Sequence, residues 1–246
     1  MPEIIAVIPA RLHSHRFPGK VLAEIRGKSL LRRTYEQVIQ STCLSRIVIA
    51  VDDPGVARHA IDFGADVVMT DPSLPSGTHR VAAALTQLRI QADIILNVQA
   101  DEPCLDPACI DMLVQCLIAH PDAGVSTPIV PIQDKEEIHA PSVVKCVIDT
   151  QGRALYFSRS PIPFSQRRCS ADIVYYKHIG LYCFRHRALQ RVIALPQTPL
   201  QEAEDLEQLK FLEYGEQIHT CTLHTASASV DLPTDIHKVE AWLCQT

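Results

Sequence analysis

The chain has 246 residues, of which 47% are hydrophobic and 21% charged, and its net charge is -5. This length and composition predict a globular protein with a substantial core, built as one α/β unit or as one with a modest insertion. A sequence isoelectric point of about 6.1 argues against a nucleic-acid-binding protein, because such domains usually have values above about 9.

The amino-terminal residues and the cysteines indicate the compartment. Met1-Pro2-Glu3 is not a positively charged leader, and the apolar run Ile4 to Ile8 is too short for a signal peptide or a membrane span. We therefore expect a cytoplasmic protein with no membrane partner. The nine cysteines include no C-x-x-C pair, so neither a disulfide framework nor a zinc ribbon fits. Cys109 and Cys116, seven residues apart, are expected on one face of a helix.

A basic loop follows the first predicted strand, Ile4 to Ile8. Pro9, Pro18 and Gly19 prevent regular structure there, and no Asp or Glu occurs between Ile4 and Ala23. A loop at the carboxyl end of a buried strand is where open α/β sheets bind ligands. We interpret the loop as a binding site for a small polyanion such as a triphosphate, the alternative being a solvated basic turn. Its cationic or titratable residues are Arg11, His13, His15, Arg16 and Lys20.

Two common phosphate-binding motifs are missing. None of the nine glycines forms a G-x-G, which excludes the dinucleotide fingerprint. Gly19-Lys20 is followed by Val21 instead of the Ser or Thr of a P-loop.

Helical and strand patterns alternate through the first half of the chain. This β-α-β-α-β order predicts a parallel sheet with right-handed crossovers. The expected elements are a helix from Leu30 to Ile39 capped by Ser29, a strand from Ile47 to Val51, a short helix through Ala57 and Ile61, a strand from Val67 to Met69, a helix through Val81 to Leu88, and a strand from Ile94 to Val98.

Two further loops follow predicted strands. The amides of Ser76-Gly77-Thr78 are expected at a helix N-terminus, where they can face an anionic ligand. Asp101 and Glu102 come directly after the strand that ends at Val98. A carboxylate pair in that position is a candidate magnesium ligand, with helix capping as the alternative.

The second half of the chain adds antiparallel strands. The predicted fold class is α/β, with a mixed, mainly parallel central sheet, helices on both faces and an antiparallel strand insertion. The expected elements are a hairpin of Val143 to Ile148 and Ala154 to Phe157, a strand from Tyr175 to Phe184, helices from Ala188 to Ala194 and from Leu200 to Tyr214, a strand from Ile218 to Leu223, and a closing helix through Ile236 and Trp242.

Taken together, these motifs resemble the 3-deoxy-manno-octulosonate (Kdo) cytidylyltransferases, in order along essentially the whole chain. The motifs are Ile8-Pro9-Ala10-Arg11, Arg16-Phe17-Pro18-Gly19-Lys20, Ser76-Gly77-Thr78, Asn97-Val98-Gln99, Asp101-Glu102-Pro103, Leu155-Tyr156-Phe157-Ser158-Arg159, His178-Ile179-Gly180, Asp205-Leu206-Glu207-Gln208-Leu209 and Val230-Asp231.

The resemblance implies a nucleotide-diphospho-sugar transferase fold and a magnesium-dependent reaction of CTP with Kdo, which forms CMP-Kdo and pyrophosphate for lipopolysaccharide assembly. It also implies a homodimer. On this basis residues 1–246 form a single nucleotidyltransferase domain, in which residues 1–130 mainly bind the nucleotide and residues 140–215 bind the sugar and pair the subunits.

The resemblance also assigns roles to individual residues. The candidate catalytic residues are Lys20, Arg11, Arg16 and Asp101, and the candidate metal ligands are Asp101 and Asp231. The nucleotide-binding set is Pro9, Ala10, Arg11, Lys20, Ser76, Gly77, Thr78 and Arg80. The sugar-binding set is Gln99, Arg159, His178, Tyr182, Glu207 and Gln208, with Lys145 and Tyr156 as weaker candidates.

Four positions depart from the family pattern: Ala100 replaces a glycine, His79 a glutamate, His15 a small hydroxyl residue and Lys210 an arginine. Three other functions stay open. They are the same transfer to another acidic sugar, such as 8-amino-Kdo or a sialic acid, a nucleotidyltransferase for a neutral sugar phosphate with UTP or GTP, and a non-catalytic nucleotide-binding protein.

Overall fold

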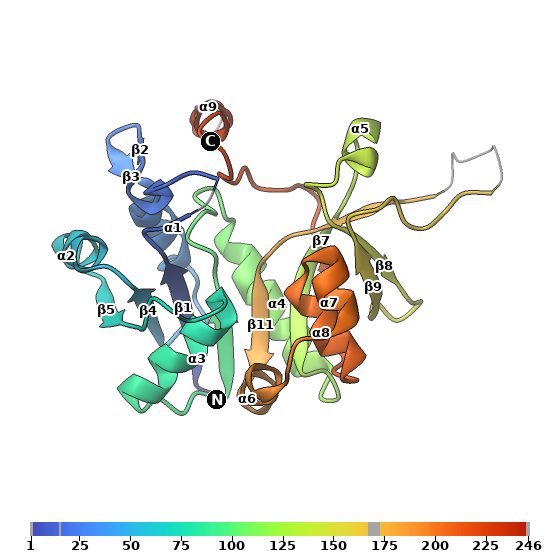
Figure 1. The fold of residues 1–246 in the computed structure, drawn as a ribbon, viewed down its shortest axis with the longest axis horizontal. Helices are drawn as coiled ribbons and strands as arrows, with labels where there is room; N and C mark the ends of the chain where they lie inside the picture. Colours follow the sequence, from blue (N-terminus) through green and yellow to red (C-terminus); the bar gives the residue numbers. More distant parts are fainter. Residues whose placement is uncertain (1, 15, 167–172, 245–246) are drawn as a thin grey trace. The chain divides into compact units, whose positions relative to one another are not determined.

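A computed structural model describes residues 2–14, 16–166 and 173–244 (Figure 1). The chain folds into two compact units. Unit 1 comprises residues 1–111 and 227–246, and unit 2 comprises residues 112–226. The chain thus leaves unit 1 within one helix and returns to it for its last 20 residues.

Unit 1 is built on a parallel sheet in the strand order β5-β4-β1-β6. All seven residues of β1 are buried, as expected of a strand covered on both faces. Its register with β4 pairs Ile5 with Arg46 and Ala10 with Val51. The strands are β1 (Ile4–Ala10), β4 (Arg46–Val51), β5 (Asp66–Met69) and β6 (Ile94–Asn97).

Three helices connect these strands, and side-chain caps fix where each helix begins. Ser29, Asp53 and Ser76 accept hydrogen bonds from the first free amides of α1, α2 and α3. Because right-handed crossovers run from β1 outward to β5 and then back to β6, α1 and α2 lie on one face of the sheet and α3 on the other. The helices are α1 (Leu30–Val38), α2 (Pro54–Asp62) and α3 (Gly77–Leu88).

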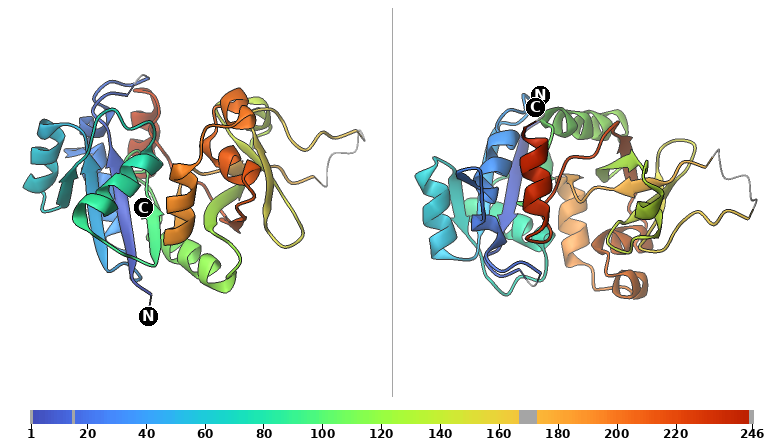
Figure 2. Two further views of the ribbon diagram at one scale, coloured as in Figure 1. Left: turned by 60° about the horizontal axis from the view of Figure 1, so that its bottom comes forward. Right: turned by 90° about the horizontal axis from the view of Figure 1, so that it is seen from above.

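The carboxyl-terminal segment packs against the beginning of the chain. Val239 of α9 (Asp235–Trp242) shares a buried cluster with Ile25, Leu30 and Val230. Figure 2 shows α9, in red, beside the blue amino-terminal segment. The blue segment includes a single 3-10 turn, η1 (Lys20–Leu22), and a hairpin that the sequence analysis did not predict, β2 (Glu24–Ile25) with β3 (Lys28–Ser29).

Unit 2 is organised around a strand that the sequence analysis also missed, β7 (Val125–Pro131). It pairs in parallel with β12 (Ile218–Thr222) and antiparallel with β10 and β11. The predicted hairpin is present as β8 (Lys145–Ile148) and β9 (Ala154–Ser158). The helices are α4 (Pro107–Ala119, begun in unit 1), α5 (Lys135–His139), α6 (His186–Ala194), α7 (Pro199–Glu204) and α8 (Glu207–Glu213).

Two predicted elements are each divided in the structure. The strand predicted from Tyr175 to Phe184 forms β10 (Tyr176–His178) and β11 (Tyr182–Arg185). The ladder breaks opposite Pro128, which has no N–H to donate, and the amide of Leu181 turns back to the carbonyl of Ile179 at 2.7 Å. The helix predicted from Leu200 to Tyr214 forms α7 and α8, because Asp205 between them adopts a left-handed conformation with φ of 52°.

The predicted fold class is confirmed, since β5, β4, β1 and β6 of unit 1 pair in parallel. Unit 2 adds antiparallel pairs beside the parallel pair of β7 and β12. Within the described residues, no helix combines the length and the apolar character needed to cross a membrane.

Candidate active site

Lys20 lies at the centre of a charged cluster in unit 1. Gly19, with φ of 68°, turns the basic loop so that Lys20 begins η1. The Lys20 side chain is buried, and its ammonium donates hydrogen bonds to Asp101 Oδ2 at 2.5 Å and to the carbonyl of Val230 at 2.9 Å. Its distance to Asp231 Oδ1 is 3.7 Å. One cation is therefore held between two carboxylates that are 130 residues apart in sequence.

The two carboxylates reach this cation from different segments. Asp101 follows β6, and its carbonyl accepts a hydrogen bond from the amide of Val230 at 3.0 Å. That bond connects the carboxyl-terminal segment to the loop after β6, and Asp231, the next residue, therefore lies near Lys20. The Asp231 carboxylate also pairs with Arg16 at 2.9 Å, in a partly exposed contact. The two carboxylates and the nearby carbonyl of Val230 form an oxygen donor set of the kind that Mg²⁺ prefers.

A neighbouring residue, Glu102, is the buried member of the predicted carboxylate pair. It accepts a hydrogen bond from Ser227 at 3.2 Å. Burial, reinforced by the negative charge of Asp101, raises the pKa of Glu102 to about 8. Its carboxyl is therefore mostly protonated at neutral pH.

Two other predicted nucleotide-binding residues differ in burial, since Arg80 is fully buried and Arg11 is half-buried. Arg80 is fully buried, where it pairs with Asp52 at 3.1 Å and donates to Thr70 at 2.6 Å. Asp52 also accepts a hydrogen bond from the amide of Leu12 at 3.0 Å, so the Arg80–Asp52 pair is connected to the basic loop. Arg11, on that loop, donates to the carbonyl of Leu74 at 2.9 Å. A direct contact of Arg80 with a nucleotide stays a prediction.

The beginning of α3 lies against the end of β1. A Cβ built on Gly77 would be 3.4 Å from Pro9 Cγ and 3.7 Å from Gln99 Nε2, so these three residues are neighbours. Ser76 caps the helix, and its hydroxyl lies 2.8 Å from His79 Nδ1. The structure thus places His79 in the helix cap. Thr78 and Ala10 are buried.

Unit 2 brings most of the predicted sugar-binding residues together. Tyr182 donates a hydrogen bond to Gln208 Oε1 at 3.1 Å, and its ring lies 5.4 Å from the ring of His178. His178 Nε2 lies 2.8 Å from the Thr127 hydroxyl. Burial raises the pKa of Tyr182 and lowers the pKa of His178 to about 3. Both side chains are therefore neutral at physiological pH. Glu207, at the first turn of α8, is close enough to raise the pKa of Tyr182 further.

Arg159 is held at the edge of unit 2 by Glu204, which the sequence analysis did not select. The Glu204 carboxylate accepts from the Arg159 amide at 2.8 Å and from the Ser158 hydroxyl at 2.6 Å. The Arg159 guanidinium donates to the carbonyls of Pro141, Glu204 and Asp205. Lys145, a weaker sugar candidate, is fully buried and donates to the carbonyls of Ala140 and Val143. Glu204 lay on a predicted amphipathic helix, where a polar residue is by default solvated.

We expect His178→Gln to make unit 2 less sensitive to acid. The pKa of His178 is about 3 in the folded chain and about 6.5 in an unfolded one, so between these values the unfolded chain binds the extra proton. The free energy of unfolding therefore falls as the pH drops through this window, by about 2 to 3 kcal/mol at about pH 4.5.

Urea denaturation of both proteins at about pH 7 and about pH 4.5 measures this difference. His139→Gln is the matched control, because His139 is exposed at the end of α5. It should keep the wild-type pH dependence. An unchanged pH dependence in His178→Gln would mean that the imidazole is not desolvated.

The parallel sheet, the basic loop at its carboxyl edge and the paired carboxylates define the class: a nucleotide-binding α/β transferase. A family model described as cytidylyltransferase matches residues 5–218. The 3-deoxy-manno-octulosonate cytidylyltransferase of Chlamydia pneumoniae is 49% identical over 97% of this chain and 93% of its own length, and that of Protochlamydia amoebophila is 46% identical over 99% and 95%.

Solved structures lead to the same family. CMP:2-keto-3-deoxy-manno-octonic acid synthetase in complex with CTP has a TM-score of 0.92, with 37% identity over 99% of both chains. The 4-diphosphocytidyl-2C-methyl-D-erythritol synthase of Anaerococcus prevotii, at 13% identity and a TM-score of 0.65, shares the fold alone. The chain belongs to the cytidylyltransferase family, within the group of 3-deoxy-manno-octulosonate cytidylyltransferases.

Proposed function

We propose that this chain transfers CMP from CTP to the anomeric hydroxyl of Kdo, releasing pyrophosphate and forming CMP-Kdo for lipopolysaccharide biosynthesis. The observation that carries the proposal is the 99% coverage and 0.92 TM-score against the synthetase solved with CTP. The cluster of Lys20, Asp101 and Asp231 in unit 1 supports it, because such a transfer needs charge neutralisation around a triphosphate.

The residues of unit 1 act by positioning and charge. The anomeric hydroxyl attacks the α-phosphorus in line, so no covalent intermediate with the protein is required. In our proposal Arg11 and Lys20 contact phosphate oxygens, and Arg16 contacts the phosphates or the sugar acid. Lys20 pairs with Asp101 and Asp231, so its ammonium would exchange these partners for phosphate oxygens when CTP binds.

Asp101 and Asp231 are the proposed magnesium ligands. Their fit to the ion rests on the donor chemistry, since two carboxylates and a carbonyl already surround one cation there. When bound, Mg²⁺ would neutralise phosphate charge and stabilise the leaving pyrophosphate.

The sugar-binding residues of unit 2 suit a polyhydroxylated acid. Neutral His178 and Tyr182 and the amide of Gln208 can exchange hydrogen bonds with hydroxyl groups without attracting a phosphate. The Arg159 guanidinium can pair with the sugar carboxylate. Glu207 is proposed to accept from a sugar hydroxyl.

Competition between acceptors tests the sugar. Kdo, 8-amino-Kdo and N-acetylneuraminate are supplied together at equal concentration with CTP and Mg²⁺, and the CMP-sugars are separated by mass. We expect CMP-Kdo to predominate. If either other product predominated, the acceptor would be that acid and not Kdo, with the same cytidylyl transfer. We further propose that the protein acts in the cytoplasm as a homodimer, which sedimentation at micromolar concentration would test.

A further inference from the structure

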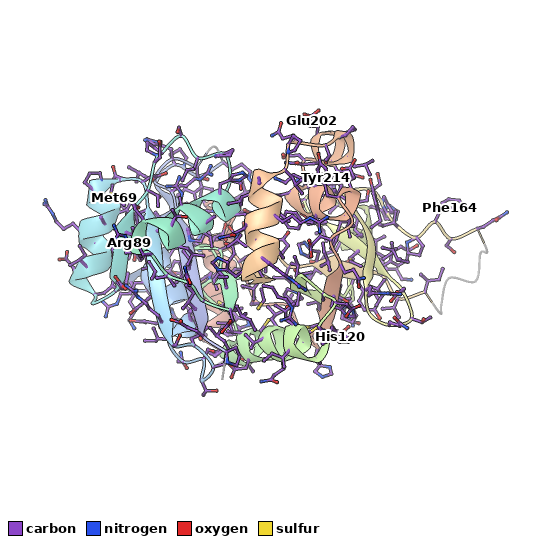
Figure 3. All side chains as sticks on the ribbon, turned by 90° about the horizontal axis from the view of Figure 1, so that it is seen from below. Met69, Arg89, His120, Phe164, Glu202 and Tyr214 are labelled. Atoms are coloured by element: carbon purple, nitrogen blue, oxygen red, sulfur yellow. The ribbon has the colours of Figure 1, made fainter. Side chains whose placement is uncertain are left out.

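One group of metal-ligand side chains in unit 2 takes no part in the proposed reaction. Cys116, His120 and His219 each offer one ligand atom, and these atoms all lie within 4.8 Å of one another. Cys116 lies in the last turn of α4, His120 follows the end of that helix, and His219 lies on β12. Figure 3 labels His120 at this end of α4.

The local structure explains why these side chains meet. Cys116 and His120 are four residues apart and so lie on the same face at the end of α4. His219 and Cys221 are two residues apart on β12 and so lie on the same face of the strand. The Cys221 thiol donates to the carbonyl of Met112 on α4 at 3.9 Å. The helix end and the strand therefore present their thiols and imidazoles to one another.

The thiol and one imidazole already lie close together. Cys116 Sγ is 3.9 Å from His120 Nδ1. The thiolate is the form of cysteine that binds metals, so an ion bound here would displace the thiol proton.

The two imidazoles come from different surroundings. His219 is buried on β12 and His120 is partly exposed. His120 Nδ1 lies 2.8 Å from the carbonyl of Cys116. A hydrogen bond from a ring nitrogen to a backbone carbonyl orients a metal-binding histidine.

Binding requires a small movement. The two imidazole rings are stacked, with centroids 3.8 Å apart and planes at 22°, so their lone pairs do not yet converge. Metal-ligand bonds of about 2.0 to 2.3 Å need ligand atoms closer together than 4.8 Å. Cys116 and His120 are only partly buried and can turn toward His219, which is buried and fixed on the strand.

We propose that Cys116, His120 and His219 form a binding site for a divalent cation of the zinc class, with water in the fourth position. Thiolate and imidazole ligands favour such ions, whereas the carboxylates of Asp101 and Asp231 favour Mg²⁺. A bound ion would fasten the end of α4 to β12 and stabilise unit 2. The site does not depend on the proposed transferase reaction.

Cobalt(II) titration of the reduced, chelator-treated protein tests the site. We expect one equivalent to bind with a thiolate-to-cobalt charge-transfer band and the visible bands of tetrahedral cobalt, and Zn²⁺ to displace it. Zn²⁺ should also raise the midpoint of thermal unfolding. Absence of the bands, or a Cys116–Cys221 disulfide that forms readily while no metal binds, would overturn the proposal.

Variants locate the ion. Cys116→Ser and His219→Gln should abolish the charge-transfer band or weaken cobalt binding at least about tenfold. His120→Ala should weaken binding with least risk to the fold, because this side chain is partly exposed. Cys43→Ser and Cys244→Ser are matched controls in unit 1 and should retain full binding. Unchanged cobalt spectra in the first three variants would also contradict the site.

Discussion

Lys20→Ala is expected to lower the turnover number by about 100- to 1,000-fold, because one well-placed electrostatic contact with the transition state is worth about 3 to 4 kcal/mol. The Lys20 ammonium lies within 4 Å of both Asp101 and Asp231. Among the described residues, no other side-chain cation is that close to both carboxylates. Arginine at this position should not restore full activity, because its planar group does not fit between two carboxylates spaced for an ammonium.

Steady-state pyrophosphate release measures this effect. Lys28→Ala is the matched control, since Lys28 makes a partly exposed pair with Glu36 at 2.7 Å, and such pairs contribute about 0 to 1 kcal/mol. It should keep nearly normal turnover. Circular dichroism should show that Lys20→Ala remains folded. Near-normal turnover of a folded Lys20→Ala would refute the placement of the triphosphate at the basic loop.

Asp101→Asn is expected to abolish magnesium-dependent turnover with little change in the fold. The substitution keeps the size of the side chain and removes the charge that faces Lys20 at 2.5 Å. It also removes one of the two anionic ligands proposed for Mg²⁺, and hard cations bind amide oxygens less strongly than carboxylates. The loss should be about 100-fold or more at saturating CTP.

Activity measured over a range of Mg²⁺ concentrations separates two explanations. If Asp101 binds the ion, the variant should need much more Mg²⁺ for any residual activity. Asp62→Asn, which removes an equal charge from the exposed end of α2, is the control and should behave as wild type. Full activity of Asp101→Asn at the Mg²⁺ concentration that saturates the wild type would show that Asp101 is not a metal ligand.

The sequence predicted the parallel strands because long apolar runs such as Ile4 to Ile8 have few other interpretations. It missed β7, whose sequence Val-Ser-Thr-Pro-Ile-Val-Pro contains two prolines. Proline normally argues against a central strand, yet β7 pairs on both sides. Pro128 has no N–H to donate, and it lies opposite the break between β10 and β11, where the ladder needs no such donor.

The candidate site was predictable in part. Strand-end loops indicated that Lys20 and Asp101 belong to one edge of the sheet, and the motif match added Asp231. No pattern indicated that Lys20 would bind Asp101 and the carbonyl of Val230, because hydrogen bonds across 81 and 210 residues depend on tertiary packing. The same holds for Cys116 and His219, whose approach depends on β12 pairing with β7.

Pyrophosphate release from CTP with Mg²⁺ and purified protein, with Kdo present and with Kdo omitted, tests the central claim most directly. The account predicts rapid release that requires Kdo and yields an equal amount of CMP-Kdo. Binding of CTP without pyrophosphate release in the presence of Kdo would contradict it and would indicate a nucleotide-binding protein without transferase activity.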